Sequence, residues 1–334
     1  MTRLELLVRR PLAFVLLALS SVPFLLVVPQ MVESRQLYER RHQSGPLPAP
    51  LAELTPAQRL RFQPLPPYAR AVPVLAYHGI GAEGDARSVR RRIFAEQMAA
   101  LRHMGFQTIS IAQYARFRRG DTRGLPARPL LITFDGGRLD SYRGADRVLA
   151  RNGFRATMFV VTGEVERENP THLTWRELHT MRDSRRWDVQ PETRDGHARV
   201  AYDSAGHTAP FYSVRRYTTS DGRESFADYE RRVTTDVFAV KDDMEEHGFE
   251  SVALAVPYGD YGQRQLGNTE VALFMRGLLS RQFPVWFTDD ELNAPDYTRP
   301  RGEPKRFEVN SAITTDRLYM WLRDHAPHSR GGRK

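Results

Sequence analysis

Apolar and polar positions follow two rhythms between residues 71 and 325 of this chain. Short apolar runs, typical of buried strands, are followed by longer segments in which apolar residues recur every three or four positions, as in amphipathic helices. The short runs predict strands at 72–77, 107–109, 129–134, 156–161, 187–190, 251–256 and 284–287. The longer segments predict helices at 94–104, 111–117, 140–152, 174–184, 226–247, 269–281 and 315–325.

This regular alternation of strand and helix indicates an α/β domain with a parallel sheet. About seven strand–helix units within residues 71–326 favour a distorted (β/α)7-type barrel over an open sheet. Residues 198–225 have no periodicity, so they are expected to form a long surface loop or insertion. No internal repeat is visible.

The N-terminus has a different pattern. Residues 11–32 are uncharged and mostly apolar, which is enough to cross a bilayer as one helix. The run is longer than the apolar part of a signal peptide and lacks an Ala-x-Ala cleavage site. Because Arg3, Arg9 and Arg10 precede it, we expect an uncleaved anchor with residues 1–10 in the cytoplasm and the rest of the protein outside. A cleaved signal or a buried core helix is the alternative.

Between this run and the domain lies a proline-rich segment, residues 33–70, which contains PLPAPLAEL and QPLPPYAR. Such sequences favour extended backbone, so the segment is expected to be a stalk. The domain follows at 71–326, and residues 327–334 form a basic tail.

The formal net charge is +9 and comes almost entirely from arginine, since lysine occurs only at 241, 305 and 334. Anionic partners such as lipid head groups or wall polymers are therefore possible. We expect no nucleic-acid partner, because no basic helix with interleaved aromatic residues is present. The chain has no cysteine, which excludes disulfides, thiolate metal sites and cysteine nucleophiles.

The most informative segment for chemistry is ITFDGGRLDSY, in which a buried strand is followed by Asp135 and two glycines. In a parallel α/β barrel the functional groups lie where strands end and loops begin. Asp135 is therefore a candidate catalytic residue, although an aspartate in this place can also cap the next helix.

Several segments together resemble the polysaccharide deacetylase family, also called the nodulation-type or carbohydrate esterase family 4 domain. The opening strand VPVLAYHGI, the block that contains ITFDGG and the turn AVPYGDYG resemble its motifs, and their order along the chain is the same. WDVQPETRDGH and RFEVNSAITTDRLYMWL resemble its histidine region and its end. The resemblance is strongest to the subgroup that acts on poly-N-acetylglucosamine.

The resemblance implies hydrolysis of N-acetyl groups with a divalent metal, most often zinc. It places Asp135 at the general base and His78 at the tip of the opening strand, with a possible catalytic role. Gly136 stands where the family has a metal-binding aspartate, and Glu192 and His197 stand at the two histidine positions.

The missing ligand would have to be replaced by Asp195, by Asp140 or by Asp135 itself. Tyr258 and Gly259 lie in the turn that supplies an oxyanion-stabilising N–H in the family. On pattern alone, Glu192, Asp195 and His197 are also consistent with solvated loop residues.

Two functions follow as expectations. The first is an extracytoplasmic, metal-dependent deacetylase of an N-acetylated, poly-N-acetylglucosamine-like polysaccharide. The second is an impaired descendant that binds the polymer or assists its synthesis and export. The expected partners are the polysaccharide, the membrane through residues 11–32, and a polysaccharide synthase.

Overall fold

The computed structural model describes residues 45–67, 71–81, 86–264, 268–289 and 304–324. The expected cytoplasmic N-terminus, the anchor at 11–32 and the basic tail at 327–334 lie outside these residues. Among the helices that are described, none combines the length and the apolar character needed to span a bilayer.

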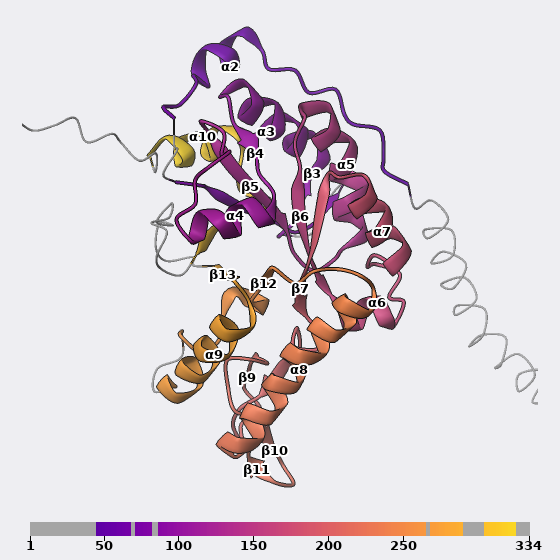
Figure 1. Cartoon of the computed structure of the whole chain (residues 1–334), viewed down its shortest axis with the longest axis vertical. Helices are drawn as coiled ribbons and strands as arrows, with labels where there is room; N and C mark the ends of the chain where they lie inside the picture. The colour runs from indigo at the N-terminus through magenta and orange to yellow at the C-terminus, as the bar shows by residue number, and fades with distance from the viewer. Residues whose placement is uncertain (1–44, 68–70, 82–85, 265–267, 290–303, 325–334) are drawn as a thin grey trace, which may run out of the picture. The chain divides into compact units, whose positions relative to one another are not determined.

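Seven parallel strands lie side by side in the order in which the chain forms them (Figure 1). They are β1 (Val74–Tyr77), β5 (Pro129–Phe134), β6 (Ala156–Val161), β7 (Trp187–Thr193), β12 (Ala253–Ala255), β13 (Val285–Asp289) and β14 (Lys305–Glu308). An additional short strand, β4 (Gln107–Thr108), pairs with β5. β14 pairs with β1 in the middle of this sheet, and the sheet curls back on itself because its two edge strands, β7 and β12, meet through Gln190. The expected (β/α)7-type barrel is thereby confirmed as a near-closed barrel of parallel strands.

The barrel closes between β7 and β12 through a side chain, whereas the other neighbours in the barrel share main-chain ladders. The buried Gln190 donates from Nε2 to the carbonyl of Glu250 at 2.8 Å. Its Oε1 accepts from the backbone N–H groups of Val252 and Ala253, each at 2.7 Å. We call this side-chain junction the seam.

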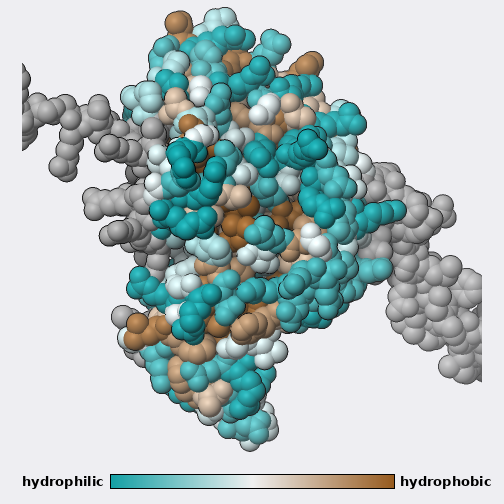
Figure 2. All heavy atoms as spheres, viewed as in Figure 1, coloured by the Kyte–Doolittle hydropathy of each residue, from teal (hydrophilic) through white to brown (hydrophobic). Residues whose placement is uncertain are grey.

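Side chains of each strand alternate between the barrel interior and the surrounding helices. On β5, Leu130, Ile132 and Phe134 belong to the core shared with the outer helices, whereas Leu131 belongs to the core inside the barrel. The helices around the barrel are α3 (Arg91–His103), α4 (Ile111–Arg118), α5 (Leu139–Asn152), α6 (Thr162–Glu166), α7 (Trp175–Asp183) and α10 (Thr315–Asp324). The two-stranded β2 (Ile80–Gly81) and β3 (Val89–Arg90) follow β1. Figure 2 shows that the visible face is mostly hydrophilic.

A second core lies beside the barrel under α8 (Phe226–Glu246) and α9 (Thr269–Gln282) (Figure 1). The insertion expected at 198–225 contributes to it, because Tyr212 is buried there with Val233 and Val237. The insertion also forms paired short strands: β8 (Arg199–Ala201), β9 (Thr208–Pro210), β10 (Tyr217–Thr218) and β11 (Gly222–Arg223). It is therefore more ordered than its lack of periodicity predicts.

The described part of the expected stalk is also structured. Residues 56–61 form the short helix α2 (Pro56–Arg61), which starts with a capping box between Thr55 and Gln58. On either side of it Leu54 and Phe62 are buried, and the Phe62 ring lies 5.3 Å from that of Tyr319. Instead of extending away as a stalk, this segment covers the outer helices of the barrel.

Candidate active site at the barrel mouth

The candidate residues lie at the carboxyl ends of the strands, as the barrel rule requires. Asp135 follows β5 directly, and its N–H donates to the carbonyl of Tyr77 on β1 at 3.0 Å. Glu192 is the sixth residue of β7, and His197 follows in the next loop. The structure therefore brings together Asp135, Glu192 and His197 at one end of the barrel.

The carboxylate of Asp135 is held by an arginine that the sequence motifs did not indicate. Arg306 on β14 donates to both carboxylate oxygens of Asp135, from Nη1 and Nη2, each at 2.7 Å. The same guanidinium lies 2.9 Å from Oδ1 of Asp289 at the end of β13. Its remaining contact is with the hydroxyl of Thr133 at 3.3 Å.

This arginine is completely buried inside the barrel. Its guanidinium lies 5.6 Å and 5.5 Å from the ring centroids of Phe159 and Phe287. Although burial alone favours the neutral form, the charges of Asp135 and Asp289 raise the pKa of Arg306 above its ordinary value. Arg306 therefore supplies a permanent positive charge beneath the mouth of the barrel.

Glu192 is buried beside this group. Its Oε2 accepts from the backbone N–H of Gly136 at 2.8 Å, and its Oε1 lies 3.4 Å from Nε2 of His197. Burial, with the nearby charge of Asp135 as a second cause, raises the pKa of Glu192 well above its ordinary value. Burial lowers the pKa of His197, partly offset by Asp135. Both effects favour a neutral acid next to a neutral imidazole.

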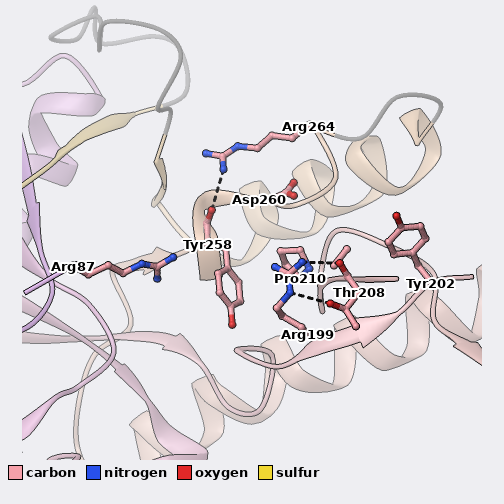
Figure 3. Close-up of a pocket in the computed structure, with 9 residues that line it drawn as sticks. Arg87, Arg199, Tyr202, Thr208, Pro210, Tyr258, Asp260 and Arg264 are labelled. Atoms are coloured by element: carbon pink, nitrogen blue, oxygen red, sulfur yellow. Dashed lines mark hydrogen bonds between the residues drawn. The ribbon is translucent and has the colours of Figure 1, made fainter. Parts of the chain in front are cut away.

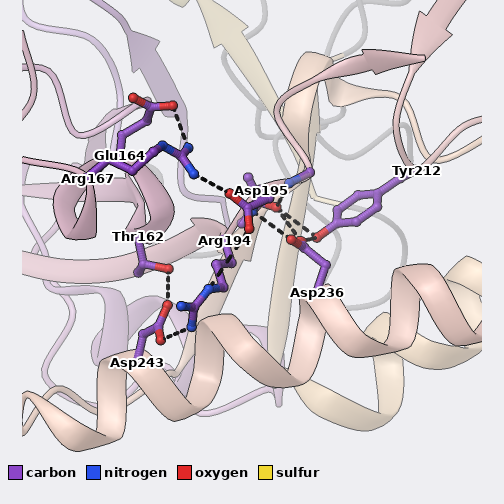
Figure 4. Close-up of polar contacts among 10 residues, drawn as sticks. Thr162, Glu164, Arg167, Arg194, Asp195, Tyr212, Asp236 and Asp243 are labelled. Atoms are coloured by element: carbon purple, nitrogen blue, oxygen red, sulfur yellow. Dashed lines mark hydrogen bonds and ion pairs between the residues drawn. The ribbon is translucent and has the colours of Figure 1, made fainter. Parts of the chain in front are cut away.

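The loop that carries His197 is fixed by two aspartates of α8 (Figure 4). Asp236 accepts from the hydroxyl of Tyr212, from the hydroxyl of Thr193 and from the backbone N–H of Asp195, the last at 2.7 Å. The residue before Asp195 is held as well, because the guanidinium of Arg194 pairs with the second aspartate, Asp243. The helix thus orders the chain between Glu192 and His197.

Asp195 does not join the site through its side chain. Its Oδ1 lies 2.7 Å from Nη1 of Arg167, which also pairs with Glu164 at the same distance (Figure 4). The side chain is half exposed. The suggested alternative, Asp140, likewise pairs with Arg138, at 2.7 Å.

Tyr258 closes the site from the other side. It lies in η1 (Pro257–Gly259) with φ of 59°, a left-handed conformation that is uncommon for a residue with a side chain. Its hydroxyl donates to the carbonyl of His197 at 2.8 Å, and its ring centroid lies 4.7 Å from that of His197. The N–H of the other turn residue, Gly259, already donates to the carbonyl of Val256 at 2.8 Å.

His78 follows β1 at the same end of the barrel. Its Nδ1 is buried and makes no hydrogen bond; the nearest carboxylate oxygen, Oε1 of Glu308, is 4.0 Å away. Its backbone carbonyl accepts from the hydroxyl of Ser141. A buried ring nitrogen without a partner is consistent with a residue that meets substrate.

A metal of the kind the resemblance implies does not fit the residues described here. Glu192 and His197 are close enough to share an ion, but Asp135 is bound by Arg306 and Asp195 by Arg167. Within the described ranges no three histidine or acidic side chains form a cluster able to hold a metal. Catalytic zinc sites use three protein ligands, and Gly136 offers no side chain for the third.

Arg306 and Asp289 were missed at the level of sequence. Asp289 lies two residues beyond the strand predicted at 284–287, and β14, which carries Arg306, was not predicted because KRFE contains a single apolar residue. The only signal was that Arg306 opens RFEVN, a segment that resembles the end of the family domain.

Comparison with known proteins supports the assignment. The sequence profile described as polysaccharide deacetylase matches residues 122–269. A 179-residue stretch is 27% identical to the poly-beta-1,6-N-acetyl-D-glucosamine N-deacetylase of Escherichia coli K12, a match that covers 48% of this chain and 26% of that protein. The chain thus spans about a quarter of the length of this relative.

Solved structures share the fold. A de-N-acetylase from Aggregatibacter actinomycetemcomitans is 16% identical, with a TM-score of 0.65, over 75% of this chain and 99% of that one. The BpsB deacetylase domain from Bordetella bronchiseptica is 22% identical, with a TM-score of 0.58, over 74% and 99%. The chain therefore resembles the polysaccharide deacetylases in the profile that residues 122–269 match, and it shares their barrel fold.

Proposed function

We propose that this protein is a polysaccharide N-deacetylase that removes acetyl groups from an N-acetylated, poly-N-acetylglucosamine-like polymer. The observation that carries the proposal is the convergence of Asp135, Glu192 and His197 at the barrel mouth, with 3.4 Å between the side chains of Glu192 and His197. The E. coli relative, named for the same reaction, supports the choice of substrate.

In this reaction water attacks the acetamide carbonyl, the C–N bond breaks, and acetate leaves while the sugar nitrogen gains a proton. Asp135 is the base of the proposal, because each carboxylate oxygen keeps a second acceptor position beside its bond to Arg306. His78 and His197 are the groups nearest the mouth that can exchange a proton with the nitrogen. No step is assigned to a metal, since the described residues do not assemble its ligands.

Another function is favoured by one specific observation. The two-point clamp of Arg306 on Asp135, together with glycine at position 136, suits a protein that holds the polymer without cleaving the amide. Such a protein would assist synthesis or export of the polysaccharide, next to a synthase.

The two functions are separated by measuring acetate release and binding with N-acetylglucosamine oligomers. A deacetylase releases acetate, and Asp135→Asn lowers the rate by about 10²-fold or more, whereas the exposed control Glu246→Gln does not. Binding without acetate release supports the holding function. Absence of both overturns both proposals. Metal analysis of the same preparation tests metal dependence, which stays a prediction.

Gly136→Asp sharpens this test. A Cβ at position 136 would lie 3.5 Å from Cγ of Arg138, so there is room for a side chain, but φ of 87° is unfavourable for aspartate. The variant must therefore be shown to fold by its circular dichroism. Acetate release that appears only in Gly136→Asp indicates an inactivated descendant, and release by the wild type supports the enzyme.

We further propose that the domain works outside the cytoplasm, anchored by residues 11–32. The support is the uncharged run preceded by three arginines. A phosphatase reporter fused to the C-terminus, active only outside the cytoplasm, is expected to be active. A reporter that is active only in its cytoplasmic form would overturn this topology.

A further inference from the structure

A cavity lies next to the candidate site, beyond Tyr258 (Figure 3). Its volume is about 300 Å³, at the lower end of the range for small-molecule sites and enough for roughly one sugar unit. Charged and aromatic side chains line it from three segments of the chain: Arg87, Arg199, Tyr202, Tyr258, Asp260 and Arg264. We call this the arginine pocket.

The arginine pocket holds three guanidinium groups and one carboxylate. Arg199 donates to the hydroxyl and the carbonyl of Thr208, at 3.2 Å and 2.6 Å. Arg264 donates to the backbone carbonyls of Tyr258, at 3.4 Å, and of Asp289. These acceptors are neutral, so the hydrogen bonds position the two cations without cancelling their charge.

The residues that line the pocket include one carboxylate, that of Asp260. Asp260 is buried, and its Oδ1 accepts from the backbone N–H of Gly262 at 2.9 Å. Arg87 and Arg199 both lie within 6 Å of the Tyr258 ring, at 5.9 Å and 5.8 Å from its centroid. Cations gathered in a concave site create a positive potential that attracts anions.

Tyr258 connects the arginine pocket to the barrel mouth. Its ring lines the pocket, and the same ring lies 4.7 Å from the imidazole of His197. A polymer unit in the pocket would therefore have its neighbour at the candidate site.

We propose that the arginine pocket binds a carboxylate-bearing sugar unit, so that the substrate is an acidic polysaccharide in which N-acetylated units alternate or mix with uronic acids. Guanidinium groups match carboxylates in shape and charge and bind them through paired hydrogen bonds. Tyr202, at the rim and partly exposed, offers an apolar surface to the sugar ring. The inference rests on the proposed function for the N-acetylated units, and it adds carboxylate-bearing units to the polymer proposed there.

The test compares two sets of oligosaccharides of equal length with the full chain. One set alternates N-acetylhexosamine and hexuronate, and the other contains N-acetylglucosamine alone. We expect the acidic set to bind at least about tenfold more tightly at 0.15 M salt, and Arg199→Gln and Arg264→Gln each to reduce this preference several-fold. Arg199→Lys, which keeps the charge, is expected to retain part of it.

A matched control removes the same charge elsewhere. Arg223→Gln alters an exposed arginine of β11, in the same insertion but outside the pocket, and should leave the preference unchanged. Equal binding of both sets by the wild type overturns the inference, as does a preference that Arg223→Gln weakens as much as Arg199→Gln and Arg264→Gln do. Folding of each variant is checked by thermal unfolding.

The outcomes also distinguish this inference from the proposed function. If neither set is deacetylated but the acidic set binds more tightly through Arg199 and Arg264, the deacetylase proposal is wrong, and the proposal that the arginine pocket binds a carboxylate-bearing sugar is supported. If neutral oligomers are deacetylated and no acidic preference exists, the pocket inference fails and the enzyme stands.

Discussion

Buried charge in this barrel is concentrated around Arg306. Its guanidinium satisfies all five of its N–H groups with Asp135, Asp289 and Thr133. Arg306 helps Asp289 to remain ionised. Burial raises the pKa of the Asp289 carboxyl, and the positive charge of Arg306 counteracts that rise. Removing the cation would leave two buried carboxylates without compensation.

Arg306→Met is therefore expected to lower the free energy of unfolding by about 3–5 kcal/mol, the usual result of breaking a buried ion pair. The control Arg323→Met removes an arginine whose partner, Asp324, is half exposed, and should lower the free energy of unfolding far less. Urea unfolding of both variants measures the difference. Similar losses would show that Arg306 is not the electrostatic centre described above.

Glu192 provides a prediction about pH. Its raised pKa means that the folded protein keeps a proton that the unfolded chain releases above about its ordinary value of 4.5. The proton bound to Glu192 therefore stabilises the folded protein fully below pH 4.5, and this stabilisation is lost as pH rises through the pKa that Glu192 has in the folded protein. In metal-free buffer, wild type should lose stability relative to Glu192→Gln as pH rises, by up to about 1.4 kcal/mol per pH unit.

This comparison needs the exposed Glu246→Gln as its control, which should follow the wild type at every pH. Unfolding measurements at pH 5, 7 and 9 are sufficient. A constant difference between wild type and Glu192→Gln would mean that Glu192 is ionised in the folded protein throughout this range.

The site residues differ in how far sequence could predict them. Asp135, Glu192 and His197 lie in segments with recognisable order and spacing, so their convergence could be expected. Arg306 is 171 positions away from Asp135 and reaches it because β14 pairs with β1, which pairs with β5. That contact depends on the pairing of the last strand of the chain with the first, which no local pattern encodes.

At the scale of elements, apolar runs predicted the strands that face apolar surroundings on both sides. β14 was not predicted because the residue that it directs into the barrel is Arg306. Arginine is a polar residue, but this one is buried through its ion pairs. The insertion at 198–225 escaped for a related reason, since its order comes from contacts with α8, such as Tyr212 with Asp236. The periodicity of apolar residues predicts segments that are buried by apolar contacts, but it does not predict segments that are buried through ion pairs or hydrogen bonds.

The side chain of Gln190 joins β7 to β12 through its hydrogen bonds. Gln190→Leu keeps the approximate volume but leaves three backbone groups without their partner, so we expect a loss of at least about 2 kcal/mol. The amides of Val252 and Ala253 should exchange faster with solvent hydrogen, while those of β5 and β6 should change little.

The control for this change is Gln63→Leu, which alters an exposed glutamine that donates to the carbonyl of Leu60 at 2.7 Å. It should have a small effect on unfolding and none on β12. If both substitutions are equally mild, other contacts hold the barrel closed at this point.

At the scale of the whole molecule, α8 connects the second core to the mouth of the barrel. Its inner face packs Val233 and Val237 into that core, and Asp236, between them in the same helix, holds the loop before His197. The regular alternation of strand and helix was enough to predict a parallel barrel of about seven units, although it did not predict β14. This connection was not predictable, because it depends on an aspartate facing inward on an otherwise amphipathic helix.

Asp236→Asn is expected to lower the free energy of unfolding by about 1–3 kcal/mol, since the amide cannot accept all three hydrogen bonds in place of the carboxylate. Amide exchange should rise at residues 193–197. The exposed neighbour Asp242→Asn serves as the control and should leave both measurements unchanged. Unaltered exchange in Asp236→Asn would indicate that the loop is held by its own turns.

The seam has a consequence for how bulky ligands enter. Separating β6 from β7 would break a ladder that pairs six residues on each strand, whereas parting β7 from β12 at Gln190 costs the three hydrogen bonds of one side chain. Widening of the wall is therefore cheapest beside Glu192, two residues along β7 from Gln190. A ligand too large for the barrel mouth would therefore meet the least resistance from the wall at that joint.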